Sequence, residues 1–365
     1  MVSRNKRRIG IAGAVAGVGA AGVGAAVGLR RLAVGRVRLR QDPDADEPFG
    51  ELRGTPMTVL ADDGLPLHVE VDGPDPSDGA VPLTIVFSHG YTLNQDSWHY
   101  QRRDLRGQGP DGPRLVFWDQ RSHGRSGRGR PDHATVRQTG EDLYAVLRAT
   151  VPPGSPVVLA GHSMGGMTIM ALAERHPELF GDQVVAVALV NTSCGDLAEM
   201  TLGLPMALAK LVRPLAPGAL RGLGRRADLV DRARGLGADV AFMVTKRMAF
   251  ADKHVSPTVV AFLEEMIRST PIDVIAEFYP ALIAHDGLDG LEALGRVPVL
   301  VAAGGQDRLT PAAHGRRIAE ALPDAEFVEV DGAGHVLPLE YPGVVTGGLR
   351  RLIDRVRPER QERSA

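Results

Sequence analysis

The sequence predicts an α/β fold with an open, mostly parallel sheet that is flanked by helices. Short apolar runs recur along the chain, and a loop and a helical pattern follow most of them. The runs are nearly continuous in apolar residues, which is typical of parallel strands that are buried on both faces. This alternation of strand and helix favours a sheet covered by helices.

The first two strands are expected in "TPMTVLADDGLPLHVEVDG", on either side of a turn at Asp63 and Gly64. The other strand candidates are residues 83–88, 115–119, 157–160, 184–191, 297–303 and 326–330. Helical patterns cover residues 135–150, 164–176, 312–322 and 344–355. Each of these helices follows a strand candidate along the chain, as an α/β sheet requires.

One long interval breaks the alternation. The stretch between Asn191 and Val297 holds no convincing strand, and its Leu-, Ala- and Met-rich segments look helical. A connection of this length does not belong in a compact domain unless it has structure of its own. We therefore expect residues 196–290 to form a helical cap inserted into the sheet domain, with additional core helices as the alternative.

The N-terminal 40 residues differ in composition from the rest. An uncharged run over residues 9–29 has basic residues on both sides, and it reaches the about 20 residues that a membrane-spanning helix needs. A membrane anchor, an export signal and a disordered tail are the alternatives, and the pair Arg7 and Arg8 suits twin-arginine export. The run contains "GVGAAG", but the strands that a dinucleotide site requires around this motif are missing.

The expected organisation is therefore a segment 1–40, a linker 41–54, a sheet domain over 55–195 and 291–357, and a polar tail 358–365. The net charge of −2 disfavours a general nucleic-acid binder. A single cysteine, Cys194, forbids an intrachain disulfide, and we expect its side chain to be buried. No His, Cys and carboxylate cluster has ligand spacing, so neither a metal nor an organic cofactor is predicted.

Ser163 lies between two glycines in "GHSMGG", where a strand candidate changes into a helical pattern. G-x-S-x-G in a strand–turn–helix context is the signature of a nucleophile elbow. Gly161 and Gly165 lack side chains, which relieves crowding where the backbone turns sharply. The sequence therefore predicts that Ser163 is a nucleophile.

Two further strand ends carry residues that could complete such a site. Asp307 follows one strand in "GGQDRLTP", and His335 follows the next in "DGAGHVLPLE". The carboxyl ends of parallel strands meet at one edge of a sheet, and the order Ser, Asp, His is that of triads with this elbow. After "SHG", the backbone N–H of Tyr91 would form an oxyanion hole together with that of Met164.

The motifs "SHGYT", "WDQRSHGRSG", "GHSMGG", "GGQDRLTP" and "GAGHVLPLE" resemble those of the α/β-hydrolase superfamily, in its cap-bearing branch of esterases and lipases. The resemblance covers roughly residues 55–355, and it implies an α/β-hydrolase fold with a helical cap. It places the family's nucleophile on Ser163, its acid on Asp307, its base on His335 and its oxyanion donors on Tyr91 and Met164.

The chain departs from the family pattern at one position, since Ser122 replaces the glycine of an Asp-x-Arg-Gly loop. This departure bears on the backbone of that loop. Some relatives place the acid after the preceding strand, which makes Asp196 the alternative to Asp307.

Together these features predict a serine hydrolase that cleaves a carboxylic ester or a related acyl bond in a small molecule with an apolar part. Thioester cleavage, acyl transfer and peroxyacid formation are alternatives with the same chemistry. A serine in the elbow argues against the branches that use a carboxylate nucleophile. A non-catalytic small-molecule receptor on the same fold is the alternative from another class. Association with a membrane would depend on residues 9–29.

Overall fold

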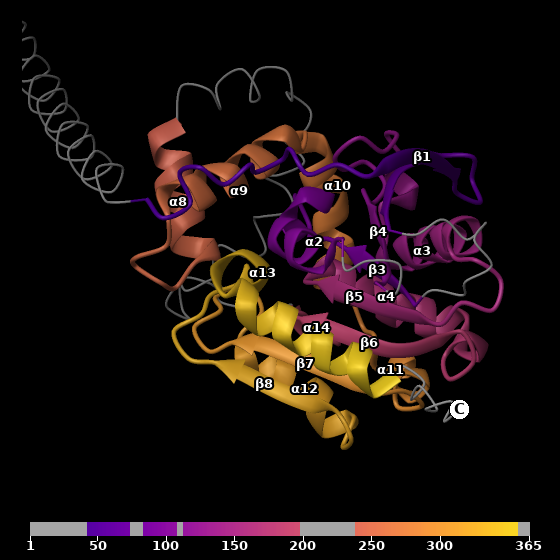
Figure 1. Ribbon diagram of the computed structural model, residues 1–365. Coiled ribbons are helices and arrows are strands. Elements are labelled where there is room, and N and C mark those ends of the chain that lie inside the picture. Colours follow the sequence, from indigo (N-terminus) through magenta and orange to yellow (C-terminus); the bar gives the residue numbers. More distant parts are fainter. Residues whose placement is uncertain (1–41, 74–82, 108–111, 198–237, 357–365) are drawn as a thin grey trace, which may run out of the picture.

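The computed structural model describes residues 42–73, 83–107, 112–197 and 238–356. Within them an eight-stranded sheet forms the centre of the molecule, in the order β1-β2-β4-β3-β5-β6-β7-β8 (Figure 1). Strand β2 is antiparallel to both of its neighbours, and the strands from β4 to β8 are all parallel. The strands are β1 (Thr55–Leu60), β2 (Pro66–Asp72), β3 (Thr84–Ser88), β4 (Arg114–Trp118), β5 (Val157–His162), β6 (Val184–Val190), β7 (Val299–Gly304) and β8 (Glu326–Val330). The predicted α/β fold is confirmed.

Helices connect the strands and cover the sheet. The described α-helices are α2 (His99–Leu105), α3 (Val136–Thr150), α4 (Met164–Arg175), α8 (Ala238–Ala249), α9 (Pro257–Ser269), α10 (Ile272–Ile283), α11 (Leu288–Leu294), α12 (Ala312–Ala321), α13 (Leu337–Glu340) and α14 (Pro342–Val356). Short 3-10 helices lie at Gln95–Trp98, Pro131–His133 and Pro177–Leu179.

The predicted elements agree with the observed ones to within two residues at each end. Strand β7 begins at Val299, two residues later than predicted, and the carbonyl of Pro298 accepts a hydrogen bond from Val187 just before it. Strand β5 runs to His162, two residues further than predicted, so the strand reaches Ser163 directly.

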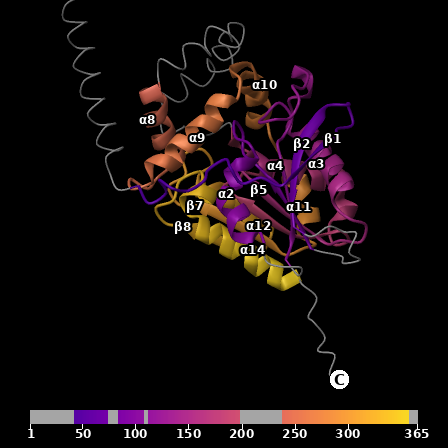
Figure 2. The same cartoon turned by 45° about the horizontal axis from the view of Figure 1, so that its top comes forward.

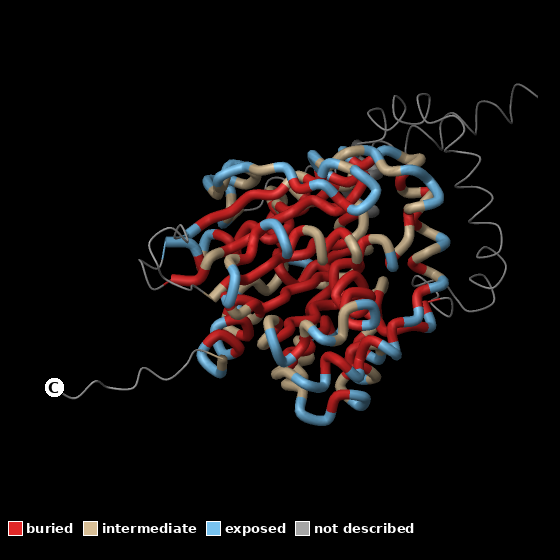
Figure 3. Tube along the Cα trace, turned by 90° about the vertical axis from the view of Figure 1, so that its right-hand side faces the viewer, coloured by how far each residue is buried: buried red, intermediate tan, exposed pale blue. Residues whose placement is uncertain are grey.

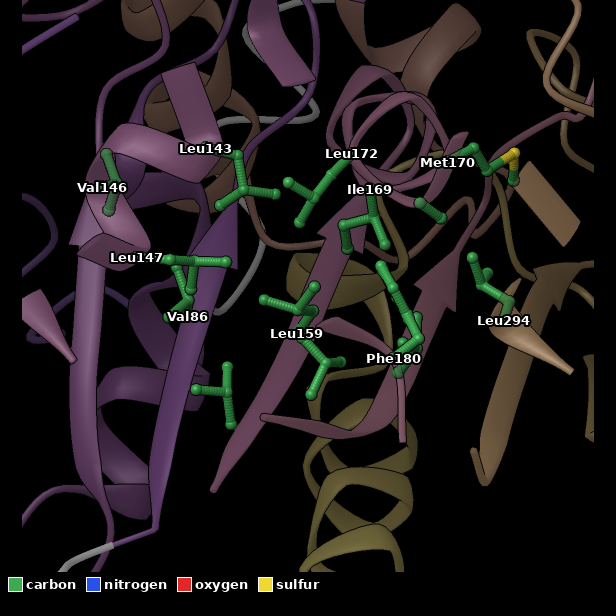
Figure 4. Packing of buried hydrophobic residues seen from close by; sticks show 14 of the residues in the cluster. Val86, Leu143, Val146, Leu147, Leu159, Ile169, Met170, Leu172, Phe180 and Leu294 are labelled. Atoms are coloured by element: carbon green, nitrogen blue, oxygen red, sulfur yellow. The ribbon is translucent and has the colours of Figure 1, made fainter. Parts of the chain in front are cut away.

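The two faces of the sheet bury different side chains, because successive residues of a strand point in opposite directions. In β3, Val86 packs toward α3 and α4, whereas Ile85 and Phe87 pack toward α2 and α14. Figure 4 shows the first of these layers, in which α3, α4 and α11 cover the sheet. Cys194 is buried in the same layer, as predicted. Figure 3 shows that the buried residues lie mainly in the interior of the molecule, in the sheet, and that the exposed residues lie mainly in the outer turns.

Helices α8, α9 and α10 lie between β6 and β7 in the chain, within the predicted cap, and residues 198–237 of that prediction lie outside the described residues. The side chains of α10 pack against α4, and those of α9 pack against Leu93 and Tyr100. Helix α11 crosses the expected boundary at residue 290. A side chain at Gly290 would come within 2.3 Å of the Met170 carbonyl oxygen, so α11 lies directly against α4.

Residues 42–54, which we name the N-terminal strap, lie along α2 and α9 (Figures 1 and 2). Asp42 accepts hydrogen bonds from the backbone N–H and the hydroxyl of Thr258, at 2.9 and 2.7 Å. Glu47 accepts one from His99 at 2.9 Å, and the ring of Phe49 stacks on Phe262 with a centroid distance of 4.6 Å. The segment expected to be a linker is therefore attached to the body.

Other expectations fall outside the described residues. They are the N-terminal segment with its apolar run over residues 9–29, and the tail 358–365. Among the helices of the described ranges, none combines the length and the hydropathy that crossing a bilayer requires.

Replacing Phe49 by Ala tests the attachment of the strap. The ring is half-buried between Phe262 and His99, so its loss should lower the free energy of unfolding by about 2 kcal/mol. Urea unfolding of the full chain would measure the change. Glu51→Ala, at an exposed position of the same strap, serves as the control and should change stability little. Equal stabilities of the two variants would contradict the packing role of Phe49.

Candidate active site

Ser163 sits in the turn between β5 and α4 with φ of 52° and ψ of −117°. A positive φ is uncommon for a residue other than glycine, and such strained backbone costs about 1–3 kcal/mol. The backbone N–H of Ser163 donates to the carbonyl of Val190 at 2.9 Å, which ties the turn to the end of β6. This geometry is that of a nucleophile elbow, with the serine at its apex.

The glycines around Ser163 make the turn sterically feasible. A Cβ at Gly165 would lie 2.1 Å from the carbonyl oxygen of Ser88 at the end of β3. A Cβ at Gly161 would lie 2.5 Å from the carbonyl oxygen of Gly165. Real Cβ atoms do not approach backbone oxygens so closely, so α4 can pack against β3 and β5 only because side chains are absent here.

The structure brings Ser163, His335 and Asp307 together from three different strand ends. The hydroxyl of Ser163 lies 3.0 Å from Nε2 of His335, and Nδ1 of His335 lies 2.8 Å from Oδ2 of Asp307. With Nδ1 protonated, His335 donates to Asp307 and presents Nε2 as an acceptor for the serine proton. Both distances are within hydrogen-bonding range, as general-base activation of a serine requires.

Asp307 is buried and surrounded by hydrogen-bond donors. Its Oδ2 accepts from the amide of Asn191 at 2.7 Å and from the hydroxyl of Thr310 at 2.8 Å, while Oδ1 accepts from the backbone N–H groups of Leu309 and Thr310. Burial alone would raise the pKa of Asp307, but the adjacent His335 and these donors outweigh it, and the pKa lies below its ordinary value. The carboxylate is thereby kept ionised and fixed in place.

Asp196, the alternative acid, is not part of this arrangement. Its carboxylate forms an ion pair with Arg317, and 59% of its side-chain surface is exposed. Asp307 is thus the carboxylate in contact with His335.

The predicted oxyanion donors follow β3 and begin α4. Met164 is the first residue of α4, where a helix has no internal acceptor for the backbone N–H. Gly90 lies against the elbow, since a Cβ there would be 3.3 Å from that of Ser163. Within the described part of the chain, no group accepts a hydrogen bond from the N–H of Tyr91. These two N–H groups are therefore candidates to bind a developing oxyanion.

Three polar residues at the site were not foreseen from the sequence. Asn191 and Thr310 hold Asp307, and His162 donates from Nε2 to the carbonyl of His335 at 2.9 Å. Burial, assisted by the nearby His335, lowers the pKa of His162 to about 3, so this ring is neutral. Asn191 gave the one usable signal, because it is a polar residue directly after an apolar strand that ends at the same sheet edge.

The loop in which Ser122 replaces a glycine nevertheless takes a glycine-like conformation. Ser122 has φ of 65°, and its hydroxyl accepts a hydrogen bond from the N–H of Gly129 at 3.0 Å. Asp119 holds the same loop by accepting from the N–H of Arg125 at 2.8 Å. Serine is thus accommodated at position 122 in a positive-φ conformation, with its hydroxyl bonded within the same loop.

A cavity of about 300 Å³ opens beside Ser163, at the lower end of the range usual for small-molecule sites. Helices α9 and α10 of the insertion supply much of its wall. Its apolar lining residues are Leu93, Met167, Leu197, Ala249, Leu263, Ile267, Leu282, Ile283, Leu309 and Val336. Thr92, Tyr279 and Thr310 add hydroxyl groups, and no Lys, Arg, Asp or Glu is among the described lining residues.

Comparison with known proteins agrees with this architecture. A monoacylglycerol lipase of Mycolicibacterium smegmatis is 29% identical over 157 residues, which are 42% of this chain and 52% of that protein. A 3-oxoadipate enol-lactonase of Acinetobacter baylyi is 26% identical over 271 residues, or 74% of this chain and 88% of that protein. The solved structure of a thermophilic esterase from Thermogutta terrifontis superposes with a TM-score of 0.63 at 24% identity, covering 83% of this chain and 99% of that one.

The sheet order, the elbow and the strand ends define a class of α/β enzymes, and a family model places the chain within it. The model of the alpha/beta hydrolase family matches residues 85–346, which is more than half of the chain. The chain therefore belongs to the alpha/beta hydrolase family and is a hydrolase of the α/β fold.

Packing around two glycines, one at the elbow and one in α14, predicts opposite effects of Gly-to-Ala substitutions on the free energy of unfolding. Gly165→Ala places a methyl group against the Ser88 carbonyl and should lower the free energy of unfolding by about 3 kcal/mol or more. Gly347→Ala, within α14, meets only the flexible end of Arg351 at 3.7 Å and should raise it by about 0.5–1 kcal/mol. Chemical denaturation would measure both, and a stable Gly165→Ala variant would argue against the close approach of α4 and β3.

Proposed function

We propose that this protein is a serine hydrolase that cleaves carboxylic esters, with Ser163 as nucleophile, His335 as base and Asp307 as the acid that orients it. The observation that carries the proposal is the hydrogen-bonded series in which Ser163 lies 3.0 Å from His335 and His335 lies 2.8 Å from Asp307. The strained elbow supports it, because strained backbone is concentrated at functional sites and Ser163 lines the cavity.

In the first half of the reaction, Nε2 of His335 takes the hydroxyl proton while Oγ of Ser163 attacks the ester carbonyl carbon. The carbonyl oxygen becomes an oxyanion, which the N–H groups of Tyr91 and Met164 stabilise. Collapse of the tetrahedral intermediate breaks the bond to the alcohol oxygen. His335 returns the proton to that oxygen, the alcohol leaves, and Ser163 carries the acyl group.

In the second half, His335 takes a proton from water, whose oxygen attacks the acyl carbon. The second tetrahedral intermediate breaks the bond to Ser163, which recovers its proton, and the carboxylic acid leaves. Throughout, Asp307 keeps Nδ1 of His335 protonated and stabilises the imidazolium. Asn191 and Thr310 hold Asp307 in the orientation that this requires.

The cavity supports a neutral, apolar group next to the reacting carbonyl. Its described wall is mostly apolar, and none of the described lining residues is a Lys or Arg that could pair with a carboxylate. Burying an unpaired charge in such a wall is unfavourable. The names of the related proteins fit ester chemistry in general, since they include a lipase, an esterase and an enol-lactonase.

Replacing Ser163 by Ala tests the nucleophile. Turnover of p-nitrophenyl butyrate should fall by about three orders of magnitude or more, since the triad acts as a unit. Initial rates of the purified variant and the wild-type protein would be compared, together with labelling by a fluorophosphonate probe. Ser126→Ala, whose serine contacts the carbonyl of Asp119 away from the cavity, controls for loss of a serine. A Ser163→Ala variant with wild-type turnover would refute the mechanism.

The aliphatic wall predicts selectivity between acyl groups of similar length. The kcat/KM for p-nitrophenyl pentanoate should exceed that for mono-p-nitrophenyl glutarate by at least about tenfold, because the glutarate brings a carboxylate into the cavity. Both esters release the same phenol, so intrinsic reactivity is closely matched. Equal or reversed preference would show that a cation reaches the substrate, and the proposed acyl selectivity would be wrong.

A further inference from the structure

The turn that carries Tyr91 is strained. Residues 90–93 form a reverse turn closed by the N–H of Leu93, which donates to the carbonyl of Gly90 at 3.1 Å. The third residue of the turn, Thr92, has φ of 63°. This is the conformation of a type II turn, where glycine or asparagine is usual, and it is unfavourable for a β-branched residue. Other contacts must therefore hold Thr92 in place.

Those contacts come from the insertion, at the corner between α9 and α10. The hydroxyl of Thr270, the residue directly after α9, donates to the carbonyl of Thr92 at 3.0 Å. The hydroxyl of Tyr91 donates to the carbonyl of Ile275 in the first turn of α10. Thr270 is only 2% exposed, so its hydrogen bond is shielded from competing water. Two consecutive residues of the turn, Tyr91 and Thr92, are thus attached to the same corner. Their partners lie 184 and 178 residues further along the chain.

We propose that Thr270 and the Tyr91 hydroxyl are positioning groups. Through them the insertion holds the turn of residues 90–93, which we name the oxyanion turn, in its strained form. The Tyr91 N–H lies in the peptide between residues 90 and 91, so its direction follows the conformation of this turn. The Tyr91 hydroxyl and the Thr92 carbonyl are the two points at which the turn is attached, so loss of either hydrogen bond would let the turn move relative to Ser163 and carry the Tyr91 N–H with it. The inference rests on the proposed function, in which this N–H binds the oxyanion.

This role differs from that of a wall residue of the cavity. The negative charge on the carbonyl oxygen develops in the transition state, so a misdirected N–H weakens binding of the transition state and of its analogues. Binding of the ester in its ground state depends mainly on the apolar side chains of the wall, and Thr270 is not among the described residues that line the cavity. Loss of the Thr270 hydroxyl should therefore lower kcat and leave KM almost unchanged.

The variant Thr270→Val tests this in the full-length protein, because it keeps the shape of the side chain and removes its hydroxyl. With p-nitrophenyl butyrate we expect kcat to fall about tenfold, which is less than complete loss of an oxyanion donor causes, with KM within about twofold of wild type. The inhibition constant of butylboronic acid, which forms a tetrahedral adduct with a nucleophilic serine, should rise by a similar factor. Thermal unfolding shows whether each variant is folded.

Matched variants separate positioning from general damage. Thr270→Ser keeps a hydroxyl and should restore most of the lost kcat. Ser269→Ala removes the neighbouring hydroxyl, which bonds to Met266 within α9, and should leave kcat and boronate inhibition unchanged. Tyr91→Phe removes the other attachment while keeping the backbone N–H, and it should lower kcat in the same way. It provides the test should Thr270→Val fail to fold.

Wild-type kcat and boronate inhibition in folded Thr270→Val and Tyr91→Phe would overturn the positioning role while leaving the proposed function intact. A rise in KM without a fall in kcat would also overturn it, since it would make these residues part of the cavity wall. Failure of the proposed function would be seen separately, as ester turnover that survives Ser163→Ala, and would overturn both.

Discussion

The structure of the site depends on the sharp backbone turn at Ser163. A positive φ at this residue sends the chain from β5 straight into α4, and the turn exists only because Gly161 and Gly165 let backbone approach backbone. The same close packing brings the ends of β3 and β6 to the serine, through Ser88 and Val190. Every other group of the proposed mechanism is placed relative to this turn, at the edge where the parallel strands end.

The helices between β6 and β7 do more than cover this edge. The carbonyl of Ala249, at the end of α8, accepts hydrogen bonds from the N–H groups of His335 and Val336, at 2.8 and 3.2 Å. Thr270 and the first turn of α10 hold the turn that carries Tyr91. The insertion is therefore bonded both to the loop that carries the proposed base and to the turn that carries a proposed oxyanion donor. The N-terminal strap, in turn, contacts α9 through Asp42 and Phe49. Residues 42–54 therefore support a helix that lies about two hundred residues further along the chain.

The polar groups of the site are buried, and the hydrogen-bond network decides their protonation. Burial keeps His162 neutral, and His89 too, whose pKa it lowers to about 3. Asp307 is ionised in spite of its burial because Asn191 and Thr310 donate to it and His335 adjoins it. Neighbouring buried groups thus hold different charges, because they differ in the hydrogen-bond donors and charged groups around them.

The sequence by itself determined the elements and the strand ends that carry Ser163, Asp307 and His335, because apolar periodicity and glycine placement are local properties of the chain. It predicted Asp307 as the acid, with Asp196 as the alternative. The contact of Asp307 with His335 and the ion pair of Asp196 with Arg317 became visible only in the tertiary structure. Only the tertiary structure showed that Asn191 donates to Asp307, that Thr270 and Ile275 of the insertion bond to the turn of residues 90–93, and that the strap is attached to α9. Each of these contacts joins residues more than a hundred positions apart, and no local pattern encodes which distant hydroxyl or amide will meet a given carbonyl or carboxylate.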